Sequence, residues 1–184
     1  LVEALEIDSN KDGRMDRFQY YNEEILVQAT RDLDFDGKID SKDFFENEKR
    51  IRFERLNEKE QIVQTVYFNE EEQPLKIEND TTDDRRFDLV YFFEKGILDR
   101  STRDTDADGI INIWLTFQND KPVEKKSDTD NDGDLEEIIL FDEEGLPTES
   151  RHDQDEDSRF ETFRFYASGE ILVAKKDRDL DSRY

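Results

Sequence analysis

Residues 104–127 read DTDADGIINIWLTFQNDKPVEKKS, and this stretch decides the fold. Its first nine residues follow the pattern D-x-[DN]-x-D-G-x-h-[DNE], where h is apolar. The same pattern occurs as DSNKDGRMD at 8–16, DLDFDGKID at 32–40 and DTDNDGDLE at 128–136. The four starts differ by multiples of 24 residues, so the sequence predicts a tandem repeat.

Degenerate copies of the pattern fill the gaps in the series. DTTDDRRFD at 80–88 has Arg85 in place of the glycine, and DQDEDSRFE at 153–161 has Ser158 there. A copy near Arg55 has lost its acids, and a last copy begins at Asp177. We therefore expect a single repeat array over residues 1–184, with partial repeats at both ends and repeats starting near 8, 32, 55, 80, 104, 128, 153 and 177.

Each repeat predicts a β-hairpin. An alternating run that ends in an aromatic residue follows each loop, as in INIWLTF at 111–117 and LEEIILF at 135–141. Positions eight and fourteen of the repeat are apolar in every copy, so we expect both on one face of one strand. A polar turn and a second short strand follow. Because the odd positions are also partly apolar, we expect a sheet that is covered on both sides or curled upon itself.

The expected fold class is all-β, with tandem 24-residue β-hairpin repeats in a curled antiparallel meander. The Asp-rich loops would line one edge of the sheet, and polar turns would line the other. A parallel β-roll solenoid is the alternative, because the short connections permit both topologies. Partly apolar faces favour the meander, since a solenoid needs one cleanly inward face.

The composition excludes several classes of protein. The chain has 51 Asp and Glu against 27 Lys and Arg, giving a formal net charge of -24, which argues against nucleic-acid binding. No apolar run approaches the length of a membrane span. The absence of Cys removes disulfides, thiolate metal sites and Cys nucleophiles. The chain starts at Leu1 with no recognisable leader, which fits a removed signal peptide or a segment of a longer chain.

The loop pattern predicts calcium sites. Carboxylates at positions one, three and five converge on one point, and a hard divalent cation with six to eight oxygen ligands relieves their repulsion. Glycine at position six permits the positive φ that wraps the chain round the ion. Position seven supplies a backbone carbonyl, and the acid at position nine closes the shell. Calcium suits this geometry better than magnesium, and zinc lacks Cys and His partners. We expect about four to six Ca²⁺ ions, held by Asp8, Asn10, Asp12, Arg14 and Asp16; by Asp32, Asp34, Asp36, Lys38 and Asp40; by Asp104, Asp106, Asp108, Ile110 and Asn112; by Asp128, Asp130, Asp132, Asp134 and Glu136; and by Asp153, Asp155, Asp157, Arg159 and Glu161.

These loops resemble the calcium loops of EF-hands, dockerins, thrombospondin type 3 repeats and integrin α-subunit propellers. An EF-hand would imply Glu at position twelve, which here holds Gln19, Asp43, Leu115 and Ile139. Only the loop at Asp32 could use that position, through Asp43, as in dockerins. An acid at position nine, as in the integrin propellers, occurs in three of the four full copies, and the fourth has Asn112 there. The hairpin units are loosely similar to the YD repeats of bacterial Rhs-type shells.

The expected function is a calcium-binding structural segment of an extracellular, cell-surface or periplasmic protein, such as a stalk, shell or fibre. Loops of this kind should bind calcium with Kd around 10⁻⁴ to 10⁻³ M. The expected partners are neighbouring repeats or further copies docked end to end. A calcium-dependent glycan- or protein-binding adhesion module is the alternative function. His152 has no Ser or Cys partner in the sequence pattern, so we predict no catalytic site and no enzyme activity.

Overall fold

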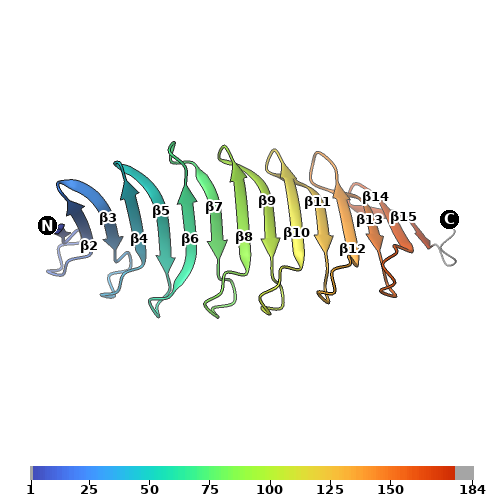
Figure 1. Ribbon diagram of the computed structural model, residues 1–184, viewed down its shortest axis with the longest axis horizontal. Coiled ribbons are helices and arrows are strands. Elements are labelled where there is room, and N and C mark those ends of the chain that lie inside the picture. Colours follow the sequence, from blue (N-terminus) through green and yellow to red (C-terminus); the bar gives the residue numbers. More distant parts are fainter. Residues whose placement is uncertain (1, 177–184) are drawn as a thin grey trace. The chain divides into compact units, whose positions relative to one another are not determined.

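The computed structural model describes residues 2–176 of the 184-residue chain. The repeat predicted to begin at Asp177 lies outside the described residues. The chain divides into two compact units, the first ending at Gly96 and the second beginning at Ile97. Every regular element of the described residues is a β-strand (Figure 1).

Eight strands make up the first unit and seven make up the second. The first unit contains β1 (Val2–Ile7), β2 (Arg17–Asn22), β3 (Ile25–Arg31), β4 (Ser41–Glu46), β5 (Lys49–Leu56), β6 (Ile62–Phe68), β7 (Pro74–Asn79) and β8 (Leu89–Glu94). The second contains β9 (Ile97–Arg103), β10 (Ile113–Gln118), β11 (Lys121–Ser127), β12 (Glu137–Phe141), β13 (Pro147–His152), β14 (Thr162–Ala167) and β15 (Glu170–Lys176).

Within each unit, the strands follow one another in sequence order, from β1 to β8 in the first and from β9 to β15 in the second. Within each unit, every strand pairs antiparallel with its sequence neighbours. Each unit is an antiparallel meander, which confirms the all-β hairpin prediction. The parallel solenoid is wrong, because its equivalent strands would pair in parallel.

This topology places the Asp-rich loops on one edge of each unit (Figure 1). Each loop precedes an even-numbered strand, and antiparallel strands return to the same edge after every second connection. The opposite edge carries tight turns such as Asn119-Asp120, where φ is 53° and 61°. Positive φ at both central residues is typical of the type I′ turn that suits two-residue hairpins.

Few hydrophobic side chains are buried among the described residues, so neither unit has a thick core. Among the described residues, Ala29 and Leu56 are the buried hydrophobic residues, and the fully buried side chains include Ser41 and Ser150. Each unit is one layer of strands, so of the two alternatives expected for the sheet, covered on both sides or curled upon itself, the first is wrong for the described residues. Aromatic rings instead pack against cations of the next strand: the Arg52 guanidinium lies 4.0 Å from the Phe44 ring centre.

Position eight of the repeat lies outside the strands. Residues such as Ile39 and Ile111 precede β4 and β10, so the prediction that positions eight and fourteen share a strand is wrong for the copies with an Asp-rich loop. The chain turns sharply at the end of the loop, because the backbone N–H of position nine donates a hydrogen bond to the last residue of the strand that precedes the loop. Asn112 N, for example, donates to Arg103 O at 3.0 Å.

Candidate functional site

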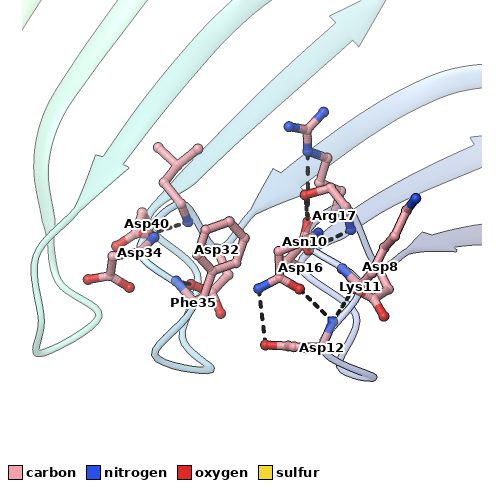
Figure 2. Close-up of polar contacts among 12 residues, drawn as sticks. Asp8, Asn10, Lys11, Asp12, Asp16, Arg17, Asp32, Asp34, Phe35 and Asp40 are labelled. Atoms are coloured by element: carbon pink, nitrogen blue, oxygen red, sulfur yellow. Dashed lines mark hydrogen bonds and ion pairs between the residues drawn. The ribbon is translucent and has the colours of Figure 1, made fainter.

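The aspartate at position one organises each loop. Asp32 accepts a hydrogen bond from the backbone N–H of Phe35 at 2.7 Å (Figure 2). It accepts a second one from the Gly37 N–H at 2.8 Å. Gly37 has φ of 94°, a conformation that side chains oppose, which explains the glycine at position six. Asp104 accepts the same two bonds in its own loop, each at 2.8 Å. The chain therefore wraps round the position-one carboxylate.

The residue at position nine closes the loop from the other side. Asp16 accepts hydrogen bonds from the Ser9 N–H and the Ser9 hydroxyl, both at 2.7 Å. Asn112, which is 1% exposed, accepts hydrogen bonds at Oδ1 from the Thr105 N–H and the Thr105 hydroxyl, both at 3.1 Å. Burial acts to raise the pKa of Asp16, but the hydrogen bonds from Ser9 outweigh it and hold the pKa below its usual value. Position nine is thus a structural acceptor in these loops.

Backbone hydrogen bonds also join neighbouring loops within a unit. The N–H at position one of a loop donates to the carbonyl at position nine of the loop before it. Asp32 N donates to Asp16 O at 2.8 Å, and Asp128 N donates to Asn112 O at 3.0 Å. Each loop is therefore held directly against the next one.

Four loops bring three or more carboxylates together. In each of these clusters, one oxygen from every member lies within 4.8 Å of the others. The clusters are Asp32, Asp34 and Asp36; Asp104, Asp106 and Asp108; Asp128, Asp130, Asp132 and Glu136; and Asp153, Asp155 and Glu161. Oxygen-only donor sets of this kind are those that calcium prefers.

Two of these clusters contain a buried carboxylate oxygen with no partner. Asp128 and Glu161 are each 6% exposed, and Asp128 Oδ1 and Glu161 Oε2 have no hydrogen-bond partner. A buried oxygen without a donor is costly, and a bound cation would remove that cost. The donor sets therefore fit a divalent cation best at the loops beginning at Asp128 and Asp153.

Electrostatics favour ionised ligands at the loop beginning at Asp104. Burial acts to raise the pKa of the Asp104 carboxyl. Hydrogen bonds, chiefly from the Gly109 N–H, outweigh burial and hold that pKa below its usual value. The carboxylate is therefore charged at neutral pH and available to a cation.

The predicted ligands are not all brought together. At position nine, Glu136 and Glu161 are members of the carboxylate clusters of their loops. Asp40, which has a shorter side chain, lies outside the cluster of its loop and accepts a hydrogen bond from the Leu33 N–H at 2.5 Å. Asp157 also lies outside its cluster and accepts the Arg159 N–H at 3.1 Å. The length of the side chain thus decides whether position nine reaches the site.

The loop beginning at Asp8 has an amide where the other full loops have a third carboxylate. Asn10 Nδ2 donates to Asp12 Oδ2 at 3.0 Å, and Asp12 N donates to Asn10 Oδ1 at 3.0 Å (Figure 2). The amide therefore links positions three and five directly. Asp8 keeps the position-one pattern by accepting the Lys11 N–H at 2.6 Å.

Asp43 is an ion-pair partner. It is 1% exposed and lies 3.1 Å from Arg31 Nη2 and 3.3 Å from Arg50 Nη1. Two guanidinium groups already neutralise the carboxylate, so the idea that Asp43 serves the loop at Asp32 from position twelve is wrong. The resemblance to a dockerin loop does not extend to this position.

The degenerate loops differ from one another. The loop beginning at Asp80 keeps the backbone pattern, since Asp80 accepts the N–H groups of Asp83 at 2.7 Å and Arg85 at 2.8 Å. The segment 57–61 is instead a five-residue turn, in which Asn57 N donates to Gln61 O at 2.9 Å. Residues 69–73 form the same turn at the opposite edge, where Asn69 N donates to Gln73 O at 2.9 Å. The matching letters NEKEQ and NEEEQ could have revealed this.

Sequence reasoning missed a polar network around His152. The statement that His152 has no Ser partner is wrong: Ser150 Oγ lies 2.8 Å from His152 Nε2, and Glu137 Oε1 lies 3.6 Å from Nδ1. Ser150 is 0% exposed and also contacts Tyr166 Oη at 3.0 Å. A Ser nucleophile must reach its substrate, and this hydroxyl is fully enclosed. Ser150 and His152 lie two residues apart on β13, whereas Glu137 comes from β12 and Tyr166 from β14, so the register of the sheet brings only the latter two to His152 and Ser150.

No protein-family model and no curated protein sequence matches the chain. Among solved structures, the chain is similar to the S. aureus protein TarM, as a mutant in complex with Fondaparinux, alpha-GlcNAc-glycerol and UDP, and to a second TarM crystal structure. In both cases the identity is 18% and the TM-score is 0.30. The match covers 65% of this chain and 21% or 20% of TarM, so this chain spans about a fifth of TarM. A likeness this distant gives no information about function.

The part of the chain that the structure describes contains no helix long and apolar enough to cross a membrane.

Proposed function

We propose that this chain is a calcium-binding structural repeat segment of an extracellular, cell-surface or periplasmic protein, in which Ca²⁺ orders the loops between hairpins. The observation that carries the proposal is the pair of buried, unpartnered carboxylate oxygens, Asp128 Oδ1 and Glu161 Oε2, inside carboxylate clusters. Such oxygens need a positive partner, and no Lys or Arg side chain forms an ion pair with them among the described residues.

The charge balance supports the same proposal. The chain carries a formal net charge of -24, and the carboxylates are concentrated at one edge of each unit. Each bound Ca²⁺ would cancel two negative charges where the repulsion is strongest. Sites of the strength expected from this ligand set would fill at the millimolar calcium found outside cells and stay largely empty in cytosol.

The sheet itself supports a structural role over catalysis. A single layer of hairpins can be extended by neighbouring repeats or by further copies docked end to end. The proposed partners are therefore more of the same repeat. We assign no enzyme activity to the enclosed Ser150, which has no route to a substrate.

One groove favours a second candidate function, calcium-dependent adhesion to a glycan or protein. The groove has a volume of about 440 Å³ and lies beside the loop at Asp32. It combines aromatic and polar groups, including Phe18, Tyr20, Gln28 and Lys42. Aromatic faces with nearby hydrogen-bonding groups suit sugar rings. A glycan array probed with calcium and with EDTA separates the two functions, since a purely structural array gives no calcium-dependent signal.

Calorimetric titration of the chain with calcium tests the principal proposal. We expect about four to six ions with Kd near 10⁻⁴ to 10⁻³ M and weaker binding of magnesium. The Asp34→Ala variant should lose one ion. The matched control Asn57→Ala should lose none, because Asn57 lies in the five-residue turn. Equal stoichiometry in all three proteins, or no calcium binding at all, would refute the proposal.

A further inference from the structure

The loops beginning at Asp104 and Asp128 touch through a side chain. Asn131, at position four of the second loop, donates from Nδ2 to Asp108 Oδ2 at 3.1 Å. Asp108 is the position-five member of the carboxylate cluster in the first loop. Its other oxygen accepts the Ile110 N–H at 2.7 Å. Two donors, one from each loop, therefore orient this carboxylate.

The loop beginning at Asp128 lacks a hydrogen bond that its counterparts make. In the other five Asp-rich loops, the N–H of position four donates to Oδ1 of position one at 2.6–2.9 Å. Here Asp128 Oδ1 is buried and has no partner, while the position-four side chain reaches the neighbouring loop. Asn131 is thus linked to both loops. In its own loop the backbone N–H of position four leaves Oδ1 of the proposed ligand Asp128 without a partner, and in the neighbouring loop its side chain contacts the proposed ligand Asp108.

We propose that calcium binding at these two loops is positively cooperative and that Asn131 is the positioning residue that couples them. This inference rests on the proposed calcium binding. A cation at the second loop would satisfy Asp128 Oδ1 and fix the loop that carries Asn131. A fixed Asn131 holds Asp108 in its ligand orientation and so strengthens the first site. Coupling between two binding equilibria is reciprocal, so filling the first site strengthens the second to the same extent.

The first unit provides an internal comparison. The loops beginning at Asp8 and Asp32 are also joined by a backbone hydrogen bond, from Asp32 N to Asp16 O at 2.8 Å. No side-chain hydrogen bond connects these two loops among the residues that the structure describes. Mutual repulsion of acidic loops acts on both pairs and is screened by salt, whereas the Asn131 contact exists only in the second unit. The loops at Asp8 and Asp32 should therefore bind nearly independently at high ionic strength.

A nearby contact offers a matched control. Ser158 Oγ donates to Asp134 Oδ2 at 2.5 Å, which joins the loop at Asp153 to the loop at Asp128. Asp134 occupies position seven, where the expected ligand is the backbone carbonyl, so this side-chain contact does not touch a ligand atom. Removing the Ser158 hydroxyl should leave calcium affinity unchanged.

The test is a calcium titration of the full chain followed by ¹H–¹⁵N NMR at high salt. The amides of Gly109 and Gly133 report on the two loops, because each donates to the position-one aspartate of its loop. Asn131→Gly removes the side chain and tolerates the φ of 62° at this position. We expect this variant to weaken calcium binding at the loop beginning at Asp104, which contains Gly109 and is called the Gly109 loop below, by about 10- to 100-fold. This is the range usual for the loss of a contact that orients a metal ligand.

Two further variants complete the experiment. Asn131→Asp keeps the size of the side chain but replaces the donor with a negative charge, so it should weaken the Gly109 loop further. Asp130→Asn, which disables the second site, should lower calcium affinity at the first. Ser158→Ala should change neither loop. Unchanged affinity at the Gly109 loop in Asn131→Gly, or a loss of affinity confined to the Gly133 loop, would overturn the coupling while leaving calcium binding intact. Failure of the wild-type chain to bind calcium would overturn the proposed function as well.

Discussion

The loops beginning at Asp128 and Asp80 have the same backbone hydrogen-bond pattern but differ in the carboxylates that they gather. In both loops the position-one aspartate accepts the N–H of position six, from Gly133 at 3.1 Å and from Arg85 at 2.8 Å. The first loop gathers four carboxylates within 4.8 Å of one another. The second has Thr82 at position three and forms no such cluster among the described residues.

A cation of the protein itself pairs with one carboxylate of the second loop. Lys59, from the neighbouring five-residue turn, forms an ion pair with Asp83, and Asn57 donates to the same carboxylate at 2.6 Å. The Lys59 hydrogen bond is the main reason that the pKa of Asp83 lies below its usual value. The comparison shows that hydrogen bonds alone can fold the loop backbone. The carboxylates of the loop, together with any cation of the protein that lies beside it, then determine whether the loop needs a metal ion.

Calcium removal should have the largest effect. A site filled at about 100 times its Kd adds about 2.7 kcal/mol to the free energy of unfolding. EDTA should therefore leave the chain largely unfolded or molten, and excess calcium should restore it. Thermal unfolding followed by far-UV circular dichroism measures the difference, with magnesium as the control ion. Equal melting temperatures in calcium and EDTA would contradict the account.

Converting the loop at Asp128 to the sequence of the loop at Asp80 should abolish one site. The double variant Asp130→Thr/Gly133→Arg removes a ligand and adds a cation at the two positions that differ most. We expect the loss of one ion by equilibrium dialysis, and a variant that still binds the wild-type number of ions would break the comparison. The φ of 101° at Gly133 also disfavours Arg, so the folded state should be checked by circular dichroism in parallel.

The reverse exchange should create a site. Thr82→Asp/Arg85→Gly restores the third carboxylate and the glycine, and it relieves the φ of 75° at Arg85. We expect one additional ion in the same dialysis measurement. Adding Lys59→Ala should strengthen the new site, because it removes the cation that pairs with Asp83. No gain of calcium in either variant would show that the carboxylates of the loop and the neighbouring cation are not the deciding factors.

The smallest expected effect concerns His152, which lies beside the loops but belongs to the sheet. Burial, followed by the charge of Arg164, lowers the pKa of His152 below its usual 6.5, although Glu137 and Glu161 oppose this. The pKa of His152 is therefore lower in the folded state than in the unfolded chain. The contribution of His152 to the free energy of unfolding is complete above the unfolded-state pKa of about 6.5, and it is lost as the pH falls through the folded-state pKa. The chain has one His, so its NMR titration is unambiguous. Arg164→Gln should raise the measured pKa, and an unchanged value would contradict this assignment.

The repeat spacing was enough to predict the hairpins, the edge that carries the loops and the carboxylate clusters, because these depend on residues close in sequence. Contacts between strands or loops could not be predicted. Asn131 meets Asp108, and His152 meets Glu137, only because the register of the sheet aligns neighbouring strands and loops. The bonding of Asp43 to Arg31 and Arg50 likewise follows from cross-strand pairing. A sequence pattern within one loop therefore predicts the candidate ligands, but it does not predict the residues of other loops and strands that contact those ligands.

Anomalous X-ray scattering from a crystal grown in calcium chloride tests the central claim most directly, because it places each ion at a named loop. The account predicts anomalous peaks among the carboxylates of the loops beginning at Asp32, Asp104, Asp128 and Asp153, a further peak at the loop beginning at Asp8, and none at the loop beginning at Asp80. Peaks absent from the four carboxylate clusters, or an equally strong peak at Asp80, would contradict it.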